Sequence, residues 1–86
     1  MSHKELCVIL TDMLNVTEAG DEVTLEKLNN EYEIVARGTY KEPKTKLDLD
    51  HDVCRTLCIS ALQYKSQHAH YMKQARETLT KLNACI

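Results

Sequence analysis

Residues 48–84 read DLDHDVCRTLCISALQYKSQHAHYMKQARETLTKLNA, a stretch that contains neither glycine nor proline. It is rich in leucine, alanine, lysine, glutamine and arginine, which favour helix, and no residue in it is a typical helix end. Asp48, Asp50 and Asp52 stand at its beginning, where negative charge complements the positive end of a helix dipole. We therefore predict one long helix over residues 48–84.

An apolar seam runs along this predicted helix. Steps of four and three residues connect positions 54, 58, 61, 65, 68, 72, 75, 79, 82 and 86, all of which are apolar except Lys65 and His68. A helix of roughly 37 residues would be about 55 Å long, whereas a compact domain of this size has a radius of gyration of about 12 Å. The helix must either break near residues 66–70 or pack its far half against another chain.

We favour the second arrangement, a homo-oligomeric helical bundle. In an isolated unbroken helix, the apolar side chains in the far half of the seam would face water, which is unfavourable. Small alanines in the seam would also allow two helices to approach closely. The expected oligomer seam consists of Cys58, Ala61, Met72, Ala75, Leu79 and Leu82.

A shorter helix is expected at the beginning of the chain. Ser2 and Glu5 form a capping box, in which the serine hydroxyl accepts from a backbone N–H and the glutamate reaches back to the serine N–H. Apolar residues then recur at helical spacing, which predicts a helix over residues 3–14.

The next segment, residues 22–37, has two interpretations. Its apolar residues share one helical face, which favours a second helix, but two short strands around Asn29 and Asn30 would form a small hairpin instead. Residues 38–47 form a connecting loop. The chain, residues 1–86, is thus predicted to be a single all-α domain with two short helices and one long C-terminal helix. The hairpin would make it an α+β domain.

Composition and charge narrow the classes of function. The chain has 86 residues, of which 43% are hydrophobic and 28% are charged, and this favours one small globular domain over a multidomain enzyme. The formal charge of −2 is too small for a dedicated polyanion or membrane binder. No apolar run is long enough for a signal peptide or a membrane span, so we expect a cytoplasmic protein in which the four cysteines are free thiols.

One group of residues has the chemistry of metal ligands. His51, Cys54 and Cys58 are spaced so that an imidazole and two thiols share one helical face. A structural zinc site needs four such ligands, and Cys7 or Cys85 could supply the fourth. The alternative interpretation is that both cysteines simply pack in the seam. Zinc is therefore an alternative cofactor, and our main expectation is that the protein has none.

The sequence contains no nucleophile in a catalytic motif, so we expect a protein that is not an enzyme. The leading hypothesis is a small regulator, adaptor or inhibitor, of the kind that phages and bacteria encode, which binds another protein and self-associates through its long helix. The partner contacts would come from Tyr64, Lys65, Tyr71, Lys73 and Arg76. A nucleic-acid accessory protein that uses the basic C-terminal strip is the other alternative.

Overall fold

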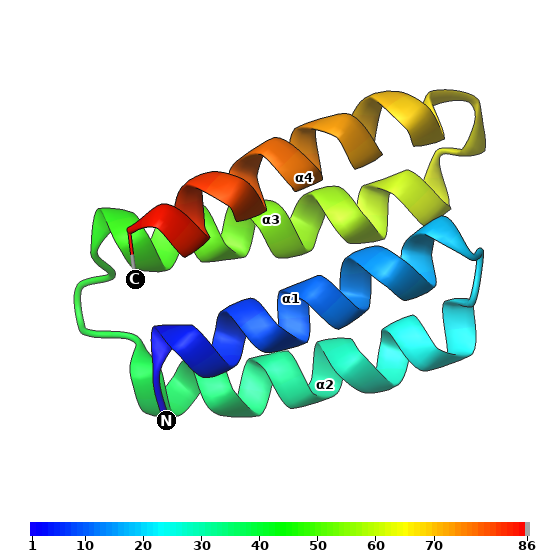
Figure 1. Ribbon diagram of the computed structural model, residues 1–86. Coiled ribbons are helices and arrows are strands. Elements are labelled where there is room, and N and C mark those ends of the chain that lie inside the picture. The colour runs from blue at the N-terminus through cyan, green and yellow to red at the C-terminus, as the bar shows by residue number, and fades with distance from the viewer. Residues whose placement is uncertain (86) are drawn as a thin grey trace.

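The computed structural model describes residues 1–85 of the chain. Within that range it contains four α-helices and a 3₁₀ turn (Figure 1): α1 (His3–Glu18), α2 (Glu22–Thr39), α3 (Lys46–Gln63), η1 (Lys65–Gln67) and α4 (His68–Ala84). These residues include no strand. The prediction of an all-α chain is confirmed. The hairpin alternative for residues 22–37 is wrong, because that segment is helical throughout.

Side-chain caps fix the starts of the first three helices. Ser2, Asp21 and Thr45 each accept a hydrogen bond from a backbone N–H three residues further on, at distances of 3.2, 3.0 and 3.2 Å. Helix α1 runs four residues beyond its predicted end, because Thr17 on its last turn is fully buried in the core. Gly20, at φ 76°, then turns the chain into α2.

The prediction of one helix over residues 48–84 is wrong. Helix α3 ends at Gln63, Tyr64 leaves the helical conformation at φ −111° and ψ 80°, and α4 returns alongside α3 (Figure 1). The return buries Met72, Leu79 and Leu82, and burial of each such side chain is worth about 1.5–3 kcal/mol. The break removes a few helical hydrogen bonds, each worth about 1 kcal/mol. Burial therefore prevails although the turn contains no glycine or proline.

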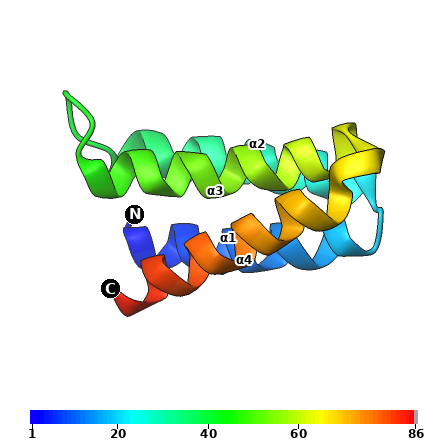
Figure 2. The same ribbon diagram turned by 90° about the horizontal axis from the view of Figure 1, so that it is seen from above.

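The four helices lie in two layers, with α2 beside α3 in one and α1 beside α4 in the other (Figure 2). Helix α1 packs against all three other helices, and α3 packs most extensively against α4. Helices α2 and α3 touch each other at few places. The radius of gyration is 12.1 Å, the value expected for a compact domain of this size. A groove between α2 and α3 is therefore left on one face of a compact bundle.

The core lies between the two layers and includes the whole predicted oligomer seam. Residues Cys58, Ala61, Met72, Ala75, Leu79 and Leu82 are all buried inside this one chain. The final seam position, Ile86, lies outside the described residues. Helices α1 and α3 of the same chain cover the apolar stripe that we expected to face water. The stripe therefore does not need a second copy of the chain to cover it. None of the described helices is both long and apolar enough to cross a membrane.

Candidate functional site: the groove between α2 and α3

The residues with metal-ligand chemistry are buried on the core side of α3 and have other partners. The Nδ1–H of His51 donates to the Leu47 carbonyl at 2.7 Å, which leaves Nε2 to accept from the Cys7 thiol at 3.5 Å. The Cys54 thiol donates to the Ala75 carbonyl at 3.6 Å. Over residues 1–85, no three His, Cys, Asp or Glu side chains are arranged to hold a metal ion.

Burial makes these thiols poor nucleophiles. It raises the pKa of the Cys7 thiol above its ordinary value. The pKa of the Cys54 thiol is also raised, mainly by its hydrogen bond with Cys58 and to a lesser extent by burial. All the cysteines of the described range are free, and of the four only Cys85 is exposed. The three buried thiols therefore serve as small core side chains.

Asp48 is the centre of a second buried polar group. Its carboxylate accepts from the His3 ring at 2.7 Å and from the backbone N–H groups of Lys41 and Thr45 at 3.2 and 3.0 Å. Burial on its own would raise the pKa of Asp48, but these hydrogen bonds outweigh it and hold the pKa well below its ordinary value. Asp48 thus joins the start of α1 to the loop before α3. This is a structural role, beyond the dipole role that the sequence indicates.

The five predicted partner-contact residues lie at the α3–α4 corner and along α4. The Tyr64 and Tyr71 rings are 6.1 Å apart, and Tyr64 is 51% exposed. Lys65 and Lys73 are exposed, and Arg76 forms an ion pair with Glu18 of α1. The structure therefore brings the two tyrosines together, but none of the five residues lines the groove between α2 and α3.

Two cavities lie one after the other in this α2–α3 groove. The first, of about 340 Å³, forms the polar end of the groove and is lined by Tyr32, Glu33, Ala36, Arg37, Tyr40, Lys41, Glu42, Lys44, Asp52 and Arg55. The second, of about 370 Å³, forms the apolar end and is lined by Glu22, Leu25, Glu26, Asn29, Ile59, Leu62 and Gln63. Because α2 and α3 are antiparallel, the two sets follow each other in order along both helices.

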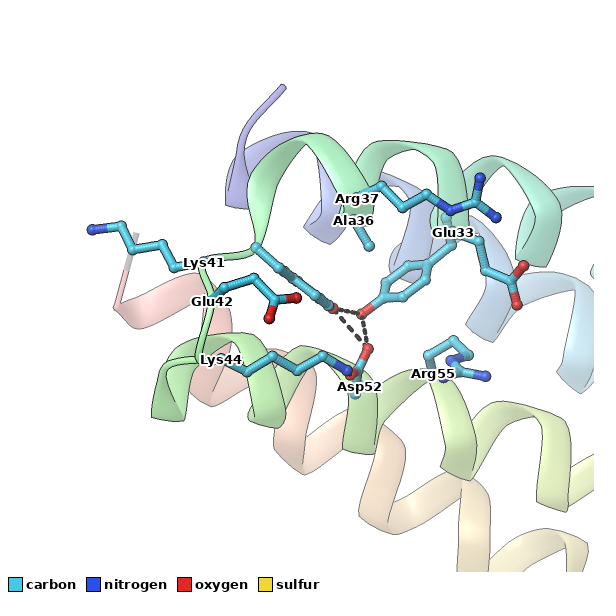
Figure 3. A pocket seen from close by; sticks show the side chains of 10 residues that line it. Glu33, Ala36, Arg37, Lys41, Glu42, Lys44, Asp52 and Arg55 are labelled. Carbon is cyan, nitrogen blue, oxygen red and sulfur yellow. Dashed lines mark hydrogen bonds and ion pairs between the residues drawn. The ribbon is translucent and has the colours of Figure 1, made fainter.

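Asp52 organises the polar end. It lies between Lys44 and Arg55 (Figure 3). The hydroxyls of Tyr32 and Tyr40 donate to its carboxylate at 3.1 and 2.8 Å, and Lys44 Nζ donates at 2.9 Å. The two tyrosine hydroxyls also lie within hydrogen-bond distance of each other, but each has a single proton, which is directed at Asp52. These contacts hold three segments together: α2, the loop after it, and α3.

Tyr32, Tyr40 and Asp52 are each held in one protonation state. Burial, together with the Tyr40 hydroxyl and the Asp52 charge, raises the pKa of Tyr32. Burial and Asp52 also raise the pKa of Tyr40. Burial opposes ionisation of Asp52, but hydrogen bonds from Lys44 and the two tyrosines lower its pKa below the ordinary value. The tyrosines stay neutral and Asp52 stays charged at neutral pH, so this network offers fixed hydrogen-bonding groups rather than a proton donor or acceptor.

Two buried polar atoms in the groove have no hydrogen-bond partner among the described residues: Arg55 Nε at the polar end and Asn29 Oδ1 at the apolar end. The Arg55 guanidinium lies over the Tyr32 ring, with its central carbon 5.8 Å from the ring centroid. Buried donors and acceptors are nearly always paired, because an unpaired one costs about 1–3 kcal/mol. Both atoms are closed off from solvent inside the protein, so they are not presented to the open groove.

Sequence patterns do not identify this groove. They assign Tyr32 to a core face and Asp52 to a helix dipole, and they do not connect the two. Tyr40 lies just beyond the end of α2 in an extended conformation, so helical periodicity does not connect it with Tyr32. The approach of Asp52 and Arg55 to the two tyrosines depends on where α3 packs.

No family model, curated protein or solved structure matches this chain.

Proposed function

We propose that this is a small non-enzymatic binding protein, a regulator, adaptor or inhibitor, that holds an amphipathic helix of another protein in the α2–α3 groove. The observation that carries the proposal is the groove itself, in which the partly buried apolar side chains Ile59 and Leu62 lie beyond a polar end that Asp52 organises. A ligand with an apolar face and a few polar side chains would match both ends of this groove.

The shape of the groove supports a helical ligand. Helix α2 has 18 residues and is therefore about 27 Å long, enough to lie beside several turns of a second helix. Ile59 and Leu62 are only partly buried at the apolar end, so the apolar face of a docked helix would cover them. Helix-in-groove recognition combines apolar anchors of this kind with a few polar contacts.

The polar chemistry supports binding rather than catalysis. The pKa directions at Tyr32, Tyr40 and Asp52 favour groups that do not change protonation near neutral pH. General acid–base catalysis works best when a group titrates near the working pH. Fixed donors and acceptors are what a recognition surface needs.

Site-specific photo-crosslinking tests the proposal. A photoreactive residue in place of Leu62 should crosslink to a helical segment of a partner protein, and that segment, once purified, should bind the wild-type chain. Val53 provides the matched control, because it is an apolar residue of the same helix that is 49% exposed and lies outside the groove. Equal crosslinking from both positions would contradict the proposal, as would crosslinks from Leu62 to nucleic acid or to a second copy of this chain.

A further inference from the structure

We draw no further inference here: the strongest candidate, the surface patch at the corner between α3 and α4 where the rings of Tyr64 and Tyr71 lie 6.1 Å apart, carries none, because nothing in the part of the chain that the structure describes shows what covers it.

Discussion

At the scale of single residues, buried polar side chains hold together segments that are distant in the sequence. Asp48 accepts hydrogen bonds from His3 of α1 and from the loop before α3, and Asp52 accepts them from Tyr32 of α2 and from Tyr40. A buried carboxylate is tolerated when such donors surround it. In a chain with a thin core of small and medium-sized apolar residues, these two networks fix how the helices are connected at one end of the bundle.

The Asp48 network predicts a specific dependence of stability on pH. Because the pKa of Asp48 is lowered in the folded state, its contribution is fully present above the ordinary aspartate pKa of about 4 and is lost as the pH falls toward the lowered value. Urea unfolding at a series of pH values should show that Asp48→Asn is less stable than wild type at neutral pH and declines less steeply in acid.

Asp50→Asn is the control for this measurement. Asp50 is on the same helix, and its carboxylate accepts no hydrogen bond from the described residues, so its variant should decline in acid as wild type does. If Asp48→Asn and Asp50→Asn had the same pH profile, the Asp48 network would have no stabilising role.

At the scale of elements, the turn between α3 and α4 decides the architecture. It forms without glycine or proline, and the backbone groups released where α3 ends need other partners. The ring of His68 provides one, because its Nδ1–H donates to the Ala61 carbonyl at 2.9 Å. In an uninterrupted helix that carbonyl would accept from the backbone N–H of residue 65. His68, which interrupts the apolar seam in the sequence, thus caps the end of α3.

This cap predicts a measurable loss of stability. His68→Ala should lower the free energy of unfolding by about 1 kcal/mol, because the Ala61 carbonyl loses its side-chain donor. Chemical denaturation followed by circular dichroism measures the difference. His70→Ala is the matched control, since His70 is exposed and two residues away on the same helix, and it should change the stability far less. Equal losses in the two variants would mean that His68 does not act as a cap.

At the scale of the whole molecule, the apolar stripe of α4 is covered by the chain's own α1 and α3. Met72, Leu79 and Leu82 are at most 7% exposed within one copy. The hydrophobic effect does not distinguish an interface within a chain from one between chains. Closure within the chain brings the stripe to α1 without the entropic cost of bringing two molecules together.

The closed bundle predicts that the stability of the chain is independent of its concentration. Leu82→Ala should lower the free energy of unfolding by about 2–4 kcal/mol at every protein concentration, because the cavity lies inside one chain. Light scattering should give the 9.9 kDa mass of a single chain for both proteins. Val53→Ala, at a half-exposed position, serves as control and should cost much less. A melting temperature that rises with protein concentration would contradict this arrangement.

Local sequence signals determined where α1 and α2 begin and favoured an all-α chain. Ser2 and Asp21 are caps because of their own side chains. The apolar spacing of residues 22–37 favoured a helix but left the hairpin open. Amphipathic periodicity shows which face of a helix avoids water, and the six residues predicted as an oligomer seam are buried, but inside one chain.

Only the tertiary structure decided which surface covers that stripe, where the predicted long helix breaks, and that α2 and α3 leave a groove between them. Helix propensity favours continuation through Tyr64, and several kcal/mol of burial against α1 and α3 outweigh it. The α2–α3 groove depends on the same packing, since Arg55 and Asn29 lie 26 positions apart in the sequence and share a groove because of how α2 and α3 pack. Periodicity specifies the apolar face of each helix, but the partner of that face is chosen by the total area buried when all four helices pack.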